Sequence, residues 1–379
     1  MSGFVLGAVP EIRFGPGRLA DIAVKAEALA GRGAVVLVVA DPALEAAGIT
    51  GLARDLLGKA GFESQTYDSF AGEARASDID SAAEMARHAG AKLVIALGGG
   101  TALDTAKLTA CCAVSGLSAM AYALCATPLP ENRLPLIAVP TTAGTGSEVT
   151  RVSVYSDPGK NKIWAWGEEL KPDAAILDPE LTVALPPAIT AGTGLDALVH
   201  AIEAATNKQA NAGNDLYCLE AIRLIAENFE KAVHQPGDIA ARGAMLLASC
   251  YAGIGIDNCG TALAHNIAHA VANLGPIPHG RATGLAMMAT MDWVAEGNRA
   301  GFARVAGALG SGDPVQAFAR LVRASGLKVS LADELGHVTP ELLARHMALP
   351  ANAPMRKSTL RYPSGDDLVM LAERFLSLS

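Results

Sequence analysis

The sequence predicts an α/β domain followed by an all-helical domain. Short runs of β-branched and apolar residues alternate with helical stretches in the first half of the 379-residue chain, which is the pattern of a parallel sheet covered by helices. From about Pro186 onward, alanine-rich helical stretches follow one another and no clear strand is found. Between these regions lies Leu185-Pro186-Pro187, where the prolines stop a helix. We therefore place the domains at residues 1–187 and 188–379.

Five runs are predicted to form the strands of the sheet. Residues 34–40 and 93–97 are apolar on both faces, as expected for parallel strands that are buried between two layers of helices. The five runs are Glu11–Gly15, Ala34–Ala40, Phe62–Tyr67, Leu93–Leu97 and Leu136–Val139.

Helices are predicted between these strands and throughout the second domain. In the first domain, one helix starts at Leu19 and another at Asp41-Pro42, a third spans Ser77–Ala89 with Ser77 as its N-cap, and a fourth spans Ala102–Ala113. The predicted helices of the second domain are 190–206, 212–233, 238–254, 261–273, 282–296, 299–309, 313–324, 340–348 and 364–378.

Composition excludes several classes of protein. Hydrophobic residues make up 51% of the chain and charged residues 18%, which excludes a disordered protein. The net charge of -8, without a cluster of Lys or Arg, argues against a nucleic-acid partner. The apolar runs are too short to span a membrane, and the first ten residues lack the basic segment of a secretion signal. The six cysteines form no CxxC motif and are expected to be buried free thiols, so we expect a cytoplasmic protein.

Two loops after buried strands carry residues suited to a dinucleotide. Gly98-Gly99-Gly100-Thr101 lets the backbone approach a phosphate at a helix N-terminus, where Thr101 could cap the helix and Asp104 lies one turn further on. The loop from Pro140 to Glu148 adds the hydroxyls of Thr141, Thr142 and Thr145. Tight or polar turns without a ligand are the alternative interpretation. Because both loops follow parallel strands, we predict that they lie at one edge of a Rossmann-like sheet.

Asp41 is the candidate for selecting the cofactor. A carboxylate at the end of the second predicted strand can accept hydrogen bonds from a ribose 2′-OH and repel a 2′-phosphate, which favours NAD over NADP. The alternative is that Asp41 only caps a helix whose first residue is Pro42. Both roles are compatible.

A metal site is predicted in the second domain. Asp196 and His200 are four residues apart and share one helix face, and His265 and His269 repeat this spacing. His279 follows after a proline-rich turn. One carboxylate with neutral imidazoles suits Fe²⁺, Zn²⁺ or Mn²⁺. The alternative, that these are ordinary core or surface histidines, is weaker because three short segments hold the whole set.

Taken together, these segments resemble the iron-containing (group III) alcohol dehydrogenases over nearly the whole chain. The segments that carry the resemblance are Ile12–Gly17, Gly98–Lys107, Pro140–Thr150, Gly194–Ala204, His265–His269 and Pro278–Gly280. The resemblance implies a dinucleotide-binding domain, a helical metal-binding domain and a dimer or larger homo-oligomer. It also implies that a divalent metal is held by Asp196, His200, His265 and His279, and that His269 lies beside nicotinamide and substrate. The cofactor contacts that it implies are Asp41, Gly99, Gly100, Thr101, Asp104, Thr141, Thr142, Thr145 and Lys162, with Leu181 lining the nicotinamide pocket.

The predicted function is therefore the interconversion of an alcohol and an aldehyde or ketone by metal-dependent hydride transfer with NAD(H). Alternatives of the same superfold are glycerol dehydrogenase, maleylacetate reductase and a dehydroquinate-synthase-like lyase. A dicarboxylate substrate would need cationic residues, for which Arg151 and Arg281 are the candidates near the motifs. A catalytically silent scaffold is disfavoured because every residue that hydride transfer needs is present. Ile256 stands where the family often has an aromatic residue, which predicts a wider substrate pocket.

Overall fold

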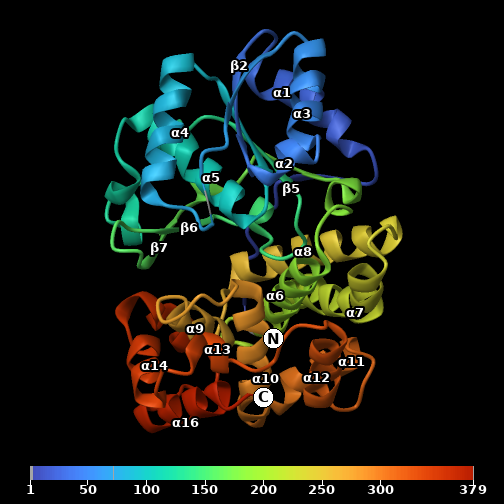
Figure 1. Cartoon of the computed structure of the whole chain (residues 1–379), viewed down its shortest axis with the longest axis vertical. Helices are drawn as coiled ribbons and strands as arrows, with labels where there is room; N and C mark the ends of the chain where they lie inside the picture. The colour runs from blue at the N-terminus through green and yellow to red at the C-terminus, as the bar shows by residue number, and fades with distance from the viewer. Residues whose placement is uncertain (1–2, 71, 379) are drawn as a thin grey trace. The chain divides into compact units, whose positions relative to one another are not determined.

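A computed structural model describes residues 3–70 and 72–378 (Figure 1). By its internal contacts the chain divides into two compact units. The α/β unit consists of Ala8–Thr142 and Ser147–Ala184. The helical unit consists of Met1–Gly7, Ala143–Gly146 and Leu185–Ser379. A short piece of the second predicted cofactor loop thus packs with the helices rather than with the sheet.

The α/β unit contains a six-stranded parallel sheet, with strand order β1-β8-β5-β4-β2-β3 among the described residues. Its strands are β1 (Glu11–Phe14), β2 (Val35–Ala40), β3 (Glu63–Tyr67), β4 (Leu93–Gly98), β5 (Leu136–Pro140) and β8 (Ala174–Leu177). The predicted α/β class and the five predicted strands are confirmed. The sixth strand, β8, was not predicted, because its Ala-Ala-Ile-Leu run fits a helix as well as a strand.

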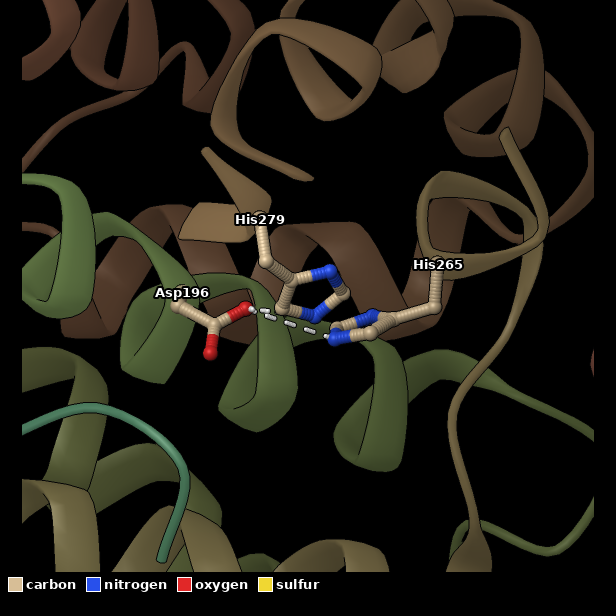
Figure 2. Close-up of side chains that lie close together, drawn as sticks. All are labelled: Asp196, His265 and His279. Atoms are coloured by element: carbon tan, nitrogen blue, oxygen red, sulfur yellow. Dashed lines mark ion pairs between the residues drawn. The ribbon is translucent and has the colours of Figure 1, made fainter. Parts of the chain in front are cut away.

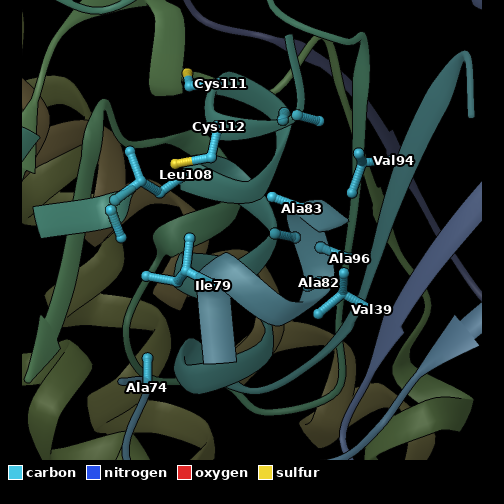
Figure 3. Close-up of a cluster of buried hydrophobic side chains, with 14 of the residues drawn as sticks. Val39, Ala74, Ile79, Ala82, Ala83, Val94, Ala96, Leu108, Cys111 and Cys112 are labelled. Atoms are coloured by element: carbon cyan, nitrogen blue, oxygen red, sulfur yellow. The ribbon is translucent and has the colours of Figure 1, made fainter. Parts of the chain in front are cut away.

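Helices cover both faces of this sheet (Figure 1). They are α1 (Ile22–Ala30), α2 (Ala43–Ala46), α3 (Ile49–Lys59), α4 (Ala76–Ala89) and α5 (Gly100–Ser115). Alternate residues of each strand point to opposite faces, so Val39, Val94 and Ala96 pack with α4 and α5 (Figure 3). Their neighbours Val38 and Ile95 pack in a second cluster with α1 and α3. Burial of both faces explains why these strands lack an apolar–polar alternation.

Two predicted helix caps are wrong. The helix after the triple glycine begins at Gly100 rather than Ala102, with Gly99 as its N-cap, so Thr101 lies in its first turn and does not cap it. The Thr101 hydroxyl instead donates to the backbone carbonyl of Gly72 (3.0 Å). Ser77 is not an N-cap either, because α4 begins one residue earlier, after the extended backbone of Arg75.

An antiparallel hairpin of β6 (Val152–Ser156) and β7 (Lys162–Trp166) was not predicted. Its turn is held by Asp157, whose carboxylate accepts a hydrogen bond from the backbone N–H of Asn161 (2.8 Å). Side chains of α5 fix the hairpin to the sheet layer: the Lys107 ammonium donates to the Val152 carbonyl (2.9 Å).

The helical unit agrees with the predicted all-α class, and no strand occurs in its described residues after Leu185. Its helices are α6 (Pro187–Thr206), α7 (Ala212–His234), α8 (Ile239–Cys259), α9 (Leu263–Val271), α10 (His279–Gly297), α11 (Arg299–Ala308), α12 (Pro314–Ala324), α13 (Ala332–Leu335), α14 (Pro340–Met347), α15 (Ala353–Ser358) and α16 (Gly365–Leu376). The main differences from prediction are that α13 and α15 were not predicted, that α8 continues to Cys259 and that α10 begins at His279.

Helix α8 is long and apolar enough to cross a membrane, with a mean hydropathy of 1.5 over its most apolar window. However, 67% of that window is buried inside the fold, and the core residues of α8 pack on α6 and α7. We therefore interpret α8 as a core helix.

The expectation of buried thiols is confirmed for five cysteines and wrong for one. All six are free, but Cys125 is exposed. It follows Leu124, and both residues have positive φ (60° and 52°), so the backbone turns sharply there, and the Cys125 thiol donates to the Trp166 carbonyl (3.5 Å).

Candidate active site

The metal-site residues all come from the helical unit. Asp196 and His200 lie on α6, which is buried from Thr190 to Thr206 apart from Thr193. Gly194 of the same helix is a position where only glycine fits: a Cβ there would lie 2.8 Å from the Phe229 ring of α7. His265 lies in the first turn of α9, and His279 is the first residue of α10.

Three of these side chains converge (Figure 2). One carboxylate oxygen of Asp196, Oδ1, lies 3.5 Å from His265 Nε2 and 3.7 Å from His279 Nε2. A ligand atom of each residue lies within 4.8 Å of the other two, so one ion could contact all three. Asp196 and His265 are buried, and His279 is partly exposed.

His200 lies directly beside this group. Its ring stacks on that of His265, with centroids 4.4 Å apart, and its Nδ1 lies 4.0 Å from Asp196 Oδ2. Nδ1 also lies 3.2 Å from the carbonyl oxygen of Gly144, which can only accept, so Nδ1 carries the hydrogen. The Nε2 lone pair of His200 is therefore available to a metal.

His269 borders the cluster without joining the three converging ligands. Its ring centroid is 5.5 Å from that of His279 and 6.4 Å from that of His265, in edge-on arrangements. The side chain is half-buried. This position suits a group that exchanges protons at the rim of the site.

The charges of the cluster are strongly coupled. Burial alone would raise the pKa of Asp196, but the surrounding histidines hold that pKa well below its ordinary value. Burial lowers the pKa of His200 and outweighs the attraction of Asp196. Burial would also lower the pKa of His265, yet the carboxylates of Glu203 and Asp196 together raise it to about 9. A permanent anion thus lies among imidazoles, as a cation site requires.

The residues present fit a divalent transition metal. Asp196 Oδ1 and His265 Nε2 are both buried, and neither makes a hydrogen bond within the described residues. Buried polar atoms without partners are costly, so such atoms facing one another indicate a missing ligand. One carboxylate oxygen with imidazole nitrogens is a donor set that Fe²⁺, Zn²⁺ and Mn²⁺ accept.

Glu203 is the functional candidate that the sequence interpretation missed. It lies on α6 seven residues after Asp196, on the same helix face, and is only 3% exposed. Its carboxylate lies 2.7 Å from His265 Nδ1. The available signal was the spacing of Asp196, His200 and Glu203, which places all three on one face of a single helix.

Four of the predicted cofactor residues meet at the carboxyl ends of β2, β4 and β5: Asp41, Gly98, Gly99 and Thr142. A Cβ on Gly98 would lie 2.7 Å from the Ala102 Cβ and 3.0 Å from the Asp41 Cβ, and Gly98 has a φ of +152°. A Cβ on Gly99 would lie 3.2 Å from Thr142. The loops are therefore in contact, and glycine is required for that approach.

Three other predicted cofactor residues form hydrogen bonds or an ion pair within the protein. Asp104 accepts hydrogen bonds from the Ser147 hydroxyl (2.6 Å) and the Val154 N–H (3.0 Å), and burial raises its pKa. The backbone N–H of Thr141 donates to the Gly98 carbonyl (2.9 Å). Lys162 forms an ion pair with Glu73 (2.9 Å).

The remaining predicted positions belong to the helical unit or to the core of the α/β unit. Thr145 belongs to the Ala143–Gly146 segment that packs with the helical unit. Leu181 is 6% exposed and belongs to the cluster beneath α1 and α3. Ile256 packs against the small cluster of Ala204 and Cys259, so the structure gives no support to a pocket widened at this position.

Glu148, in the short 3-10 turn after β5, is a buried carboxyl group with an unusual titration. It is 1% exposed, and its Oε1 has no hydrogen-bond partner among the described residues. Burial raises its pKa to about 7, although Lys107 acts in the opposite direction. The carboxyl is thus partly protonated near neutral pH.

We expect Glu148→Gln to make the fold more stable at alkaline pH. In wild type, the pKa of Glu148 in the folded state lies above its unfolded value of 4.5, so the protonated carboxyl stabilises the fold. This stabilisation is fully present below pH 4.5 and is lost as the pH rises through about 7. The loss corresponds to about 3 kcal/mol in the free energy of unfolding. Urea unfolding of both proteins at about pH 5 and about pH 9 measures this difference. Glu84→Gln, at an exposed site on α4, is the control; equal pH dependence in all three proteins would contradict the prediction.

Comparison with known proteins identifies the family. The model of the iron-containing alcohol dehydrogenases matches residues 10–179, and that of the C-terminal part of Fe-containing alcohol dehydrogenases matches residues 190–371. The chain is 38% identical over 306 residues to the probable alcohol dehydrogenase EutG of Escherichia coli, covering 79% of this chain and 77% of that protein. It is 30% identical over 318 residues to the NAD-dependent methanol dehydrogenase of Bacillus methanolicus, covering 83% and 80%.

Solved structures agree along the whole chain. The crystal structure of a 1,3-propanediol oxidoreductase superposes with a TM-score of 0.91 at 28% identity, covering 99% of this chain and 100% of the other. The NAD⁺ complex of sulfoacetaldehyde reductase from Bifidobacterium kashiwanohense superposes with a TM-score of 0.90 at 29% identity, covering 100% of both. The resemblance predicted from the motifs is confirmed: the chain belongs to the iron-containing alcohol dehydrogenase family, and it interconverts an alcohol and an aldehyde.

Proposed function

We propose that this alcohol dehydrogenase uses NAD(H) and a divalent metal, Fe²⁺ or Zn²⁺, held by Asp196, His200, His265 and His279. The observation that carries the proposal is the convergence of three ligand atoms within 4.8 Å, two of them buried without hydrogen bonds to any described residue. We assign residues 1–187 to nucleotide binding and 188–379 to metal binding. By analogy with the family, the enzyme is a cytoplasmic homo-oligomer whose partner molecules are small alcohols and aldehydes.

The chemistry divides between the bound groups and the chain. A divalent metal at this site would supply Lewis acidity, which favours loss of the proton from an alcohol. Nicotinamide supplies hydride acceptance and donation. Asp196 contributes the negative charge that holds the cation, and His200 presents Nε2 because its Nδ1 donates to Gly144. His269, half-buried at the rim, takes up the alcohol proton and passes it to solvent.

A dicarboxylate reductase is not favoured, because both candidate cationic residues are engaged. The Arg281 guanidinium donates to the Lys328 carbonyl, the Ser330 carbonyl and the Glu334 carboxylate, at 2.6–2.7 Å. Arg151 is paired with Glu168 and stacks over Trp166. Neither side chain is available to a substrate carboxylate without breaking these contacts.

The proposed function is tested by metal analysis and turnover of the same preparation. We expect near-stoichiometric Fe or Zn in the purified protein, and NADH oxidation with short aldehydes or ketones. Activity should disappear after chelation and return on adding Fe²⁺ or Zn²⁺. Turnover of aldehydes by fully metal-free protein would refute the metal assignment, and turnover of dicarboxylates alone would favour the reductase.

Asp41→Ser is expected to weaken the preference for NADH. Asp41 directly follows β2, and its Oδ1 accepts a hydrogen bond from the Ala43 N–H (3.0 Å), which a serine hydroxyl can also accept. The substitution removes only the charge that would repel a 2′-phosphate, so kcat/KM for NADPH relative to NADH should rise on the order of 10- to 100-fold. Asp55→Ser, which removes an exposed charge from α3, is the control. An unchanged ratio would mean that Asp41 serves only as a helix cap.

A further inference from the structure

Glu203 is a buried carboxylate that makes three hydrogen bonds to one short segment. Its Oε2 accepts from the backbone N–H of Ala262 (2.6 Å), and its Oε1 accepts from the N–H of Ala264 (2.7 Å). The third contact joins Oε2 to Nδ1 of His265 at 2.7 Å. The carboxylate therefore binds both the start of α9 and the ring that this helix carries.

The first two bonds hold α9 in place. The N-cap residue Ala262 has no side chain that could satisfy the free N–H groups at the start of this nine-residue helix. Glu203 of α6 satisfies two of them and places a negative charge at the positive end of the helix dipole. This part of its role is structural.

The third bond acts on the metal site. A carboxylate can only accept, so His265 Nδ1 must carry the hydrogen that the two atoms share. In a neutral ring, Nε2 then keeps its lone pair, and Nε2 is the atom that lies 3.5 Å from Asp196 Oδ1. The ring is also fixed in plane by stacking on His200. Ring orientation and tautomer thus both suit ligation through Nε2.

We propose that Glu203 is a positioning residue for the metal: it fixes His265 in the Nδ1–H form and so sets the affinity of the site. The inference rests on the proposed metal function. Hydrogen-bond partners of ligating histidines typically change metal affinity 10- to 100-fold when they are replaced. If Glu203 served only as a helix cap, replacing it would lower stability without changing which ring nitrogen of His265 carries the hydrogen.

Glu203→Gln separates these two roles. The amide has one accepting oxygen, so it cannot accept from Ala262, Ala264 and His265 together. If its oxygen takes the Oε1 place, its NH₂ group faces His265 Nδ1 and favours the Nε2–H form, which cannot bind a metal through Nε2. If its oxygen takes the Oε2 place, the bond to His265 is kept, but the negative charge that makes the ring a stronger ligand is lost. Both placements weaken ligation through Nε2. We expect the dissociation constant for Zn²⁺ or Co²⁺, from chelator competition, to rise about 10- to 100-fold. The visible Co²⁺ spectrum should change at the same time.

A second variant controls for the loss of a helix cap. Asp313 caps α12 through the N–H groups of Val315 and Gln316, away from the metal ligands. Asp313→Ala removes this cap and should lower stability while leaving the metal dissociation constant unchanged. Equal metal affinity in wild type and Glu203→Gln would overturn the inference.

A measurement without metal keeps this inference separate from the proposed function. In ¹⁵N-histidine-labelled, metal-free wild type, at a pH high enough for the ring to be neutral, His265 should show the Nδ1–H tautomer. The resonance is assigned by its loss in His265→Ala. An Nε2–H tautomer in wild type would overturn the inference even if Glu203→Gln did not fold. If wild type bound no metal, the proposed function would fail, and the tautomer would still decide the role of Glu203.

Discussion

His265→Ala is expected to remove bound metal and to lower turnover by about 10³-fold or more. His265 is one of the three groups whose ligand atoms lie within 4.8 Å, and its Nε2 is buried without a hydrogen bond to any described residue. Loss of Lewis-acid assistance costs several kcal/mol of transition-state stabilisation, and each 1.4 kcal/mol is about tenfold in rate. Metal content of the purified variant and steady-state NADH oxidation measure both effects.

The same variant should bind NADH as wild type does. In the predicted cofactor loops, Gly98, Gly99 and Thr142 belong to the α/β unit, whereas His265 belongs to the helical unit. NADH fluorescence titration therefore tests whether the damage is confined to the metal site. His337→Ala, an exposed histidine of the helical unit, is the matched control. Aldehyde turnover retained by the metal-free variant would show that His265 is not a ligand.

The parallel sheet was predictable because its strands are buried on both faces. Val35–Ala40 and Leu93–Gly98 consist almost wholly of β-branched and apolar residues, and short runs of this composition between helical stretches are typical of the central strands of a parallel sheet. β8 could not be predicted, because four residues of Ala, Ile and Leu fit a helix as well as a strand. The β6–β7 hairpin depends on contacts with α5, such as that of Lys107 with Val152, which spacing along the chain does not reveal.

The residues of the candidate metal site could be predicted from the sequence, but their arrangement in space could not. The four-residue spacing of Asp196 and His200 places both on one face of α6, whichever helix packs against it. That His265 and His279 meet Asp196 depends on how α9 and α10 pack on α6. Glu203 escaped notice because its role arises from backbone N–H groups some 60 residues away, and no residue type in the sequence marks a backbone donor. The Thr101 hydroxyl was assigned to a cap for a related reason, since its partner, the Gly72 carbonyl, is also backbone.

Gly280→Ala tests whether close packing of α10 on α6 assembles the metal site. Gly280 follows His279 directly, and a Cβ on it would lie 2.2 Å from the carbonyl oxygen of Gly192 and 2.6 Å from its carbonyl carbon. These are backbone atoms of α6, so the added methyl can be accommodated only if the start of α10 moves away. His279 would then retreat from Asp196, to which its Nε2 now lies at 3.7 Å.

We expect Gly280→Ala to lose about 1–3 kcal/mol of stability, because the added methyl overpacks the helix contact. Turnover should fall roughly 10²-fold, because a displacement near 1 Å is enough to spoil a catalytic geometry. Metal affinity should fall with turnover, which distinguishes a displaced ligand from a merely less stable protein. Gly307→Ala is the matched control: it lies within α11, and a Cβ there would meet no atom within 4 Å. That substitution should raise stability by up to about 1 kcal/mol, since alanine is the better helix former. Metal affinity and substrate turnover equal to those of wild type would contradict this prediction. They would show that α10 can shift without displacing His279, so that the approach of His279 to Asp196 does not depend on contact between the two helix backbones.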